Sequence, residues 1–203
     1  MLSKRLILVL ALVTGISAGF TQDTSHILKV IFRYGSIPAP GHEEREYREV
    51  GGLFGGHVSL GLDSLEIGFS NKRRVHTFQK SNNPTGYYYW EYLKYYEDGL
   101  VTKKSATIEI PLSHEKYNKL REILVGYIEK TPYDYAFFGI RCASATYEVL
   151  SQIGIVEPLS YNRNIIGNFY PRLFRRKMLR LARKNHYTII RQNGRGTRIW
   201  EGG

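Results

Sequence analysis

The chain has 203 residues, of which 42% are hydrophobic and 13% aromatic, and its formal net charge at pH 7 is +11. This length and composition fit one globular domain with a substantial core rather than two domains. Because Cys142 is the only cysteine, an internal disulfide is excluded.

Residues 1–20 have the three parts of a secretory signal peptide. Two basic residues begin the segment, an apolar run covers 6–13, and small residues follow. The apolar run is too short for a comfortable membrane span. We predict cleavage after Ala18, or alternatively near Gln22, and a secreted or periplasmic protein in which residues 21–203 form a single domain. An uncleaved N-terminal anchor is the alternative.

In the N-terminal half of the expected domain, β-rich runs predict strands at 26–33, 57–62, 65–70 and 74–78. A two-residue hairpin turn at Asp63 and Ser64 would pair residues whose numbers sum to 127. Ser70 would then lie opposite His57 on the same face, or Asn71 if the loop were one residue longer.

The tyrosine-rich segment 79–104 shows no clear period. We interpret it as an insertion loop whose tyrosines pack on the domain. The alternative is a loop that lines or covers a substrate groove, because rigid amphipathic rings are common in binding loops.

In the C-terminal half, the run ATIEIPL at 106–112 alternates as a strand does, and Ser113 is placed to cap a helix that ends before Pro132. A second helix is predicted to begin at Cys142 and to end near Gly154. A strongly basic helix is predicted at 171–185. Strands at 187–191 and 197–200 would form a closing hairpin around Asn193 and Gly194 and complete an α+β fold.

Positive charge is concentrated near the C-terminus. Residues 161–203 contain eleven lysines and arginines against one acid, Glu201. Such asymmetry indicates an anionic partner. Outside the cytoplasm that partner would be phospholipid headgroups or a carboxylate-bearing cell-wall polymer rather than nucleic acid, for which no recognition motif is present. A solvated face on a basic protein is the alternative.

Cys142 is predicted to lie in the first turn of its helix, on the apolar side. At that place the backbone N–H groups and the helix dipole favour the thiolate. A lone thiol in an exported protein cannot serve in an internal disulfide, which favours a nucleophile. The alternative is a small buried hydrophobic residue.

A cysteine nucleophile needs a base, usually a histidine. Among the six histidines, His57 is favoured because it opens a core strand directly behind Gly55 and Gly56, where missing side chains would let a substrate backbone approach. His76, on the next predicted strand, is the second choice. The scattered His, Asp and Glu residues show no metal-ligand spacing, and no cofactor is expected.

These motifs together resemble the circularly permuted papain-like branch of the NlpC-type superfamily, which includes cell-wall peptidases and lecithin:retinol acyltransferase-like enzymes. The resemblance rests on the Gly-Gly-His strand, the ATIEIPL strand leading into a helix, and the cysteine at a helix start, and it covers roughly residues 26–155. It implies a permuted papain-like fold, with an antiparallel sheet packed against helices and the nucleophile at a helix N-terminus.

The resemblance also implies roles for individual residues. Cys142 would be the nucleophile, His57 the base, and Ser70 or Asn71 the third polar residue. Residues lining the substrate site would be Tyr133, Tyr135, Gly55, Gly56 and Arg141.

The implied function is that of a secreted cysteine hydrolase. It would cleave an amide bond in peptidoglycan peptide through a thioester acyl-enzyme. One alternative is a lipid-directed acyltransferase or esterase on the same fold. The other is a non-catalytic binding descendant, because Arg141 precedes the cysteine and the third residue is undecided.

Overall fold

The computed structural model describes residues 26–43, 52–72, 74–82, 84–93, 103–194 and 196–201. The expected signal peptide at 1–20 lies outside these ranges. A six-stranded antiparallel sheet forms the centre of the fold. In spatial order its strands are β6 (Gly86–Tyr92), β4 (Leu65–Asn71), β3 (Gly56–Leu62), β1 (His26–Tyr34), β7 (Ser105–Leu112) and β9 (Thr188–Gln192).

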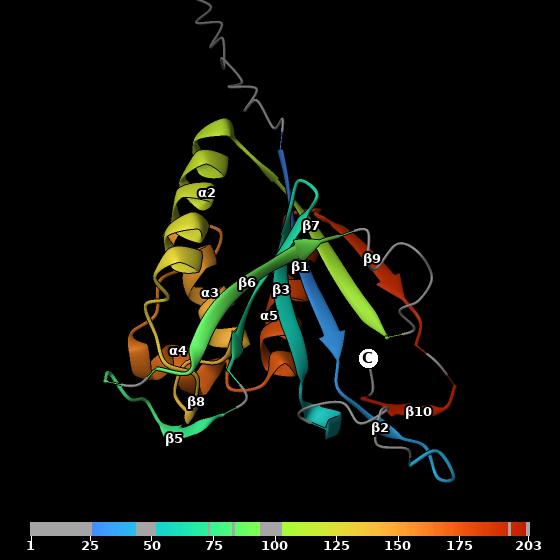
Figure 1. The fold of residues 1–203 in the computed structure, drawn as a ribbon. Coiled ribbons are helices and arrows are strands. Elements are labelled where there is room, and N and C mark those ends of the chain that lie inside the picture. Colours follow the sequence, from blue (N-terminus) through green and yellow to red (C-terminus); the bar gives the residue numbers. More distant parts are fainter. Residues whose placement is uncertain are drawn as a thin grey trace, which may run out of the picture.

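The helices gather on one face of this sheet (Figure 1). α2 (His114–Glu129) contacts β6 and β7, and α3 (Cys142–Gln152) contacts β3 and β4. α5 (Pro171–Lys184) covers β1, β3, β7 and β9, while α4 (Tyr161–Gly167) packs against α3. The expected α+β class, with an antiparallel sheet packed against helices, is confirmed. No helix within the described ranges combines the length and apolarity needed to cross a membrane.

Local sequence accounts for where two of the helices begin. The Ser113 hydroxyl accepts a hydrogen bond from the N–H of Lys116 at 3.4 Å, as a helix N-cap does. α3 begins at Cys142, and the Ser144 hydroxyl accepts the N–H of Arg141 at 2.9 Å. Beyond the end of α3, Gly154 has a φ of +66°, the left-handed conformation that glycine adopts most readily.

Period-two alternation divides the sheet residues between two faces. On β3, Val58 and Leu60 point toward the helices and are buried with the aliphatic and aromatic core. His57, Ser59 and Gly61 occupy the opposite face, which the described helices leave uncovered and which we call the open face. The two faces of one strand therefore meet different environments.

Two short strand pairs flank the main sheet. β5 (His76–Phe78) pairs in parallel with β8 (Ala136–Phe138), and β2 (Ser36–Pro38) pairs antiparallel with β10 (Arg198–Trp200). A 3₁₀ turn, η2 (Gly52–Phe54), contacts β2. The predicted C-terminal hairpin is therefore wrong, because β9 extends the edge of the main sheet beside β7 whereas β10 pairs with β2.

The segment expected as an aromatic insertion loop contains β6, an edge strand of the main sheet. Its alternation is masked in the sequence because aromatic residues occupy both faces. Tyr88 is buried against Phe69, whereas Tyr87 and Tyr89 lie on the open face. Residues 94–102 of the expected loop lie outside the described residues.

The C-terminal part of the chain closes on the end of β1. The buried Arg175 guanidinium forms an ion pair with the buried Glu201 carboxylate and lies 3.5 Å from the centre of the Tyr34 ring. The Glu201 N–H also donates to the Gly35 carbonyl at 3.2 Å. This set of contacts, the C-terminal clasp, holds β10 in place.

Candidate functional site

Cys142 lies at the first position of α3, in the core and only 4% exposed. Burial raises the pKa of its thiol. The opposing influences are the N–H groups of Val58 and Ala143, the positive charge of Arg141 and the Tyr135 hydroxyl. The cost of desolvating the thiolate therefore outweighs the stabilisation that the helix start gives to it. The protonated thiol is favoured at neutral pH.

His57 lies on the open face of β3. Its Nε2 atom is 3.0 Å from the Tyr89 hydroxyl of β6, and it is paired across the sheet with Arg33. Burial of the ring, followed by the positive charge of Arg33, lowers the pKa of His57 from 6.5 to about 4. The imidazole is therefore neutral at pH 7.

The structure does not bring His57 and Cys142 together as a nucleophile and base. His57 shares the open face with Arg33, whereas the thiol contacts the β3 backbone from the helix-covered side. Adjacent strand residues point to opposite faces, so Val58 points toward α3 and His57 away from it. No hydrogen bond joins the two side chains among the described residues, and the Cys142–His57 dyad stays a prediction.

The other expected catalytic residues also lie apart from the thiol. The hairpin register is confirmed, since Ser59 pairs with Gly68 and their numbers sum to 127. Ser70 consequently lies on the open face, opposite Tyr87 of β6, and Asn71 ends β4 opposite Gly86. Neither side chain hydrogen-bonds to His57, whose Nε2 atom instead lies 3.0 Å from the Tyr89 hydroxyl.

The two tyrosines expected near the nucleophile have different partners. Tyr135 does approach Cys142, and its hydroxyl acts on the pKa of the thiol. Tyr133 instead donates a hydrogen bond to Glu148 on α3. Of this pair, only Tyr135 is in contact with the thiol.

The two glycines before His57 serve the fold rather than an open groove. Gly56 has a φ of +92°, and a Cβ atom there would lie 2.2 Å from the Arg33 carbonyl oxygen. The backbone that approaches this glycine pair is therefore the chain's own. Gly55 is buried and its N–H donates to the Gly52 carbonyl at 3.2 Å.

The Arg141 guanidinium packs against aromatic rings and a backbone carbonyl. Its guanidinium stacks over the ring of Phe169 at 3.8 Å and donates a hydrogen bond to the Phe169 carbonyl. The rings of Phe137 and Tyr170 lie within 6 Å of the same guanidinium. Arg141 thus joins the start of α3 to an aromatic cluster.

A polar network that sequence reasoning missed occupies the open face. Arg33 donates to both oxygens of Glu66, at 2.5 and 2.7 Å, and to the Ser59 hydroxyl at 3.2 Å. Ser59 in turn donates to Glu66 at 2.5 Å. Ser59 and Glu66 are completely buried. The sequence did hold a signal for this network. Each of two strand-like runs contains a charged residue at an inner position, Arg33 in one and Glu66 in the other.

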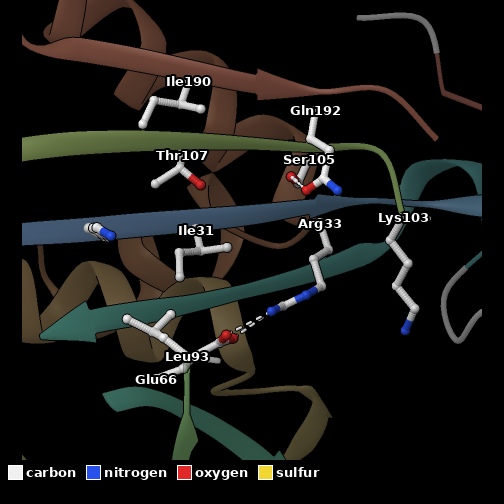
Figure 2. Close-up of a pocket in the computed structure, with 10 residues that line it drawn as sticks. Ile31, Arg33, Glu66, Leu93, Lys103, Ser105, Thr107, Ile190 and Gln192 are labelled. Atoms are coloured by element: carbon white, nitrogen blue, oxygen red, sulfur yellow. Dashed lines mark hydrogen bonds and ion pairs between the residues drawn. The ribbon is translucent and has the colours of Figure 1, made fainter. Parts of the chain in front are cut away.

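The network borders a hollow of about 220 Å³ on the open face (Figure 2). Arg33 reaches toward Glu66 at one side of the hollow, and Lys103 lies on the other side of Arg33. Cationic, hydroxyl, amide and aliphatic side chains from β1, β7 and β9 surround it. The lining residues are Lys29, Ile31, Arg33, Glu66, Leu93, Lys103, Ser105, Thr107, Ile190 and Gln192.

The second-choice histidine, His76, forms a separate buried pair. Its Nδ1 atom is 2.6 Å from the Asp134 carboxylate, which also accepts the N–H groups of Thr85 and Lys80. These bonds tie β5 to the segment before β8. Within the described ranges, no three His, Cys, Asp or Glu side chains gather as metal ligands.

Comparisons with known proteins supply no relative. A scan against protein-family models, a search of curated proteins and a search of solved structures each found no match. The functional inference therefore depends on the geometry of this chain alone.

Proposed function

We propose that this protein is a binding protein, on a permuted papain-like scaffold, that holds a small anionic ligand on the open face of its sheet. The observation that carries the proposal is the hollow beside the Arg33–Glu66 pair. Concave sites that combine apolar walls with a few convergent polar groups are the usual form of ligand sites.

The charge of the lining favours an anion. Three cationic side chains, Lys29, Arg33 and Lys103, line the hollow against one carboxylate, Glu66. Arg33 engages both oxygens of Glu66, and the lining side chains taken together carry a formal charge of +2. Ligand carboxylates are recognised by such groups through charge-assisted hydrogen bonds.

The size and polarity of the hollow favour a small polar ligand. A hollow of about 220 Å³ is smaller than the roughly 300–1,000 Å³ of sites for drug-sized molecules. Ser105, Thr107 and Gln192 supply hydrogen-bonding groups, while Ile31 and Ile190 supply apolar wall. A single amino acid or the free carboxyl end of a short peptide fits this description. Together with the predicted export signal, these features favour carboxylate-bearing cell-wall peptide as the ligand class that we propose.

Calorimetric titration of the protein with soluble peptidoglycan fragments tests this proposal. We expect the Lys29→Ala/Lys103→Ala variant to bind about tenfold more weakly, and the affinity of the wild type to fall with added salt. Lys119→Ala, an exposed lysine on α2, is the matched control and should bind as the wild type does. Absence of wild-type binding, or equal binding by the double variant, would contradict the proposal.

A second candidate is the cell-wall cysteine hydrolase, and one observation favours it. The N–H of Val58 and the hydroxyl of Tyr135 both act on the Cys142 sulfur, at a helix start where an oxyanion would be stabilised. The raised thiol pKa and the position of His57 weigh against it, because acyl transfer needs a base within reach. Release of new amines from peptidoglycan that is abolished by Cys142→Ala would establish this candidate over the first.

A further inference from the structure

β5, β8 and α4 lie at one end of the molecule (Figure 1). A cluster of aromatic rings comes from β5, β8 and the residues that follow α4. We call Phe78, Phe137, Phe138, Phe169 and Tyr170 the aromatic end. Neighbouring ring centres are 4.7–5.5 Å apart, from Phe78 to Phe138, Phe137, Phe169 and Tyr170 in turn. The rings therefore form one continuous surface rather than scattered apolar residues.

Much of this surface faces solvent. Phe78 is 66% exposed and Phe138 52% exposed, and Ile166 of neighbouring α4 is 72% exposed. Contiguous apolar patches of this kind mark interaction sites in soluble proteins, whereas single exposed apolar residues do not. The aromatic end shares no residue with the hollow on the open face.

The rings are held on a rigid support. The buried His76–Asp134 pair and the N–H groups of Thr85 and Lys80 fix the two short strands that carry Phe78 and Phe138. Because the support is already ordered, docking would immobilise few side chains. The surface is thus prepared for a partner without rearrangement.

The segments around the aromatic end are strongly basic, which favours an anionic partner. The contributing segments 74–82, 136–141 and 160–177 contain no acidic residue. Their cations are Arg74, Lys80, Arg141, Arg163, Arg172, Arg175, Arg176 and Lys177. Arg175 is buried in the C-terminal clasp, and the exposed cations include Arg74, Lys80 and Arg163.

We propose that the aromatic end docks on the surface of an anionic lipid bilayer, with its rings at the headgroup–acyl boundary and its cations among the phosphates. Aromatic side chains favour this boundary, and basic residues near the surface add electrostatic attraction to anionic lipid. Arg141, the residue before α3, holds its guanidinium 3.8 Å from the centre of the Phe169 ring and adds a cation beside the rings. The surface combines β5, β8, α4 and the start of α5, so the basic C-terminal region supplies only part of it.

Vesicle co-sedimentation of the full chain tests the proposal. Vesicles of phosphatidylglycerol and phosphatidylcholine are compared with vesicles of phosphatidylcholine alone. We expect Phe78→Ser/Phe138→Ser to reduce partitioning onto the anionic vesicles by about tenfold or more, because two exposed rings are lost from the bilayer contact. Lys80→Glu/Arg163→Glu should reduce it similarly at low salt and less at high salt.

Matched variants isolate the surface. Tyr92→Ser removes a ring that is 62% exposed on edge strand β6 and should change partitioning by less than about twofold. The N-terminal apolar run is common to every variant, so differences between variants report the aromatic end. Thermal unfolding checks that each variant folds, and Ile166→Ser replaces the ring variant if that one does not.

Three outcomes would overturn the proposal. One is equal partitioning of the wild type and folded ring variants. Another is equal wild-type binding to neutral and anionic vesicles. The third is a dimer in sedimentation velocity that the ring variant abolishes without any change in vesicle binding, which would assign the surface to a second copy of the chain.

Discussion

The two faces of the central sheet are stabilised by different kinds of contact. On the helix-covered face, Val58, Phe32 and Ile108 bury apolar surface against α3 and α5, and Cys142 lies within that layer. On the open face, Arg33 and Glu66 are nearly or completely buried without helix cover and satisfy one another. One face is stabilised by burial of apolar area and the other by mutual satisfaction of charge.

The difference between the two faces indicates which buried side chains can act on a ligand. A thiol in an apolar layer loses the hydration that its anion requires, so its position at a helix start is not enough to activate it. A buried ion pair adds little net stability compared with apolar residues of similar volume. We therefore attribute the position of the Arg33–Glu66 pair beside the hollow to the proposed ligand site rather than to folding stability.

The largest expected effect comes from breaking the open-face ion pair. Glu66→Gln removes the buried negative charge that accepts both Arg33 hydrogen bonds, and we expect the free energy of unfolding to fall by about 3–5 kcal/mol. Arg33→Met/Glu66→Leu should recover most of that loss, because it makes the open face resemble the other one. Urea denaturation measures both variants.

Glu109→Gln is the control for that experiment. Glu109 lies on the same face, opposite Lys29, but it is only partly buried. Its loss should lower stability by less than about 1 kcal/mol. A similarly small loss for Glu66→Gln would mean that the Arg33–Glu66 pair is hydrated and that the contrast between the faces is smaller than we describe.

An intermediate effect is expected from the protonation of His57. Its folded-state pKa of about 4 lies below the ordinary 6.5, so the unfolded chain binds more protons between these values. Stability should be full above about pH 6.5 and should fall as the pH drops toward 4, by about 1–3 kcal/mol for this partly accessible ring.

His57→Gln should remove that contribution. Denaturation midpoints for the wild type and the variant, measured from pH 4 to 7, separate His57 from the other titrating groups. Parallel stability curves for the two proteins across this range would show that the ring is not held neutral by the open face.

The smallest effect concerns the thiol on the helix-covered face. Because burial raises the pKa of Cys142, we expect a maleimide to label the folded protein at least tenfold more slowly than the urea-unfolded chain at pH 7.5. Reaction that is rapid in the folded protein and persists at pH 6 would indicate a thiolate and would favour the hydrolase.

Short-range patterns predicted much of the fold. The turn at Asp63 and Ser64 set the register of β3 and β4, and Ser113 marked the start of α2, because both signals depend on neighbouring residues. The helix start at Cys142 and the left-handed Gly154 were predictable for the same reason.

Long-range choices were not predictable from local patterns. Alternation placed His57 and Ser70 on one face, but only the packing of α3 decides which face the thiol approaches. β6 was hidden because rings occupy both of its faces, and β10 selects β2 over the nearer β9 through pairing distant in sequence. The placement of the thiol relative to His57 depends on this same long-range packing.

The contacts of the C-terminal clasp can form only after the residues near position 200 have been synthesised. The hydrogen bond from Arg198 to Ser36 joins positions 162 residues apart, and the Arg175 charge is buried only when Glu201 has arrived. A chain synthesised as far as residue 190 lacks both contacts. Completion of the fold therefore follows synthesis of these last residues, and contacts of such long range also close slowly.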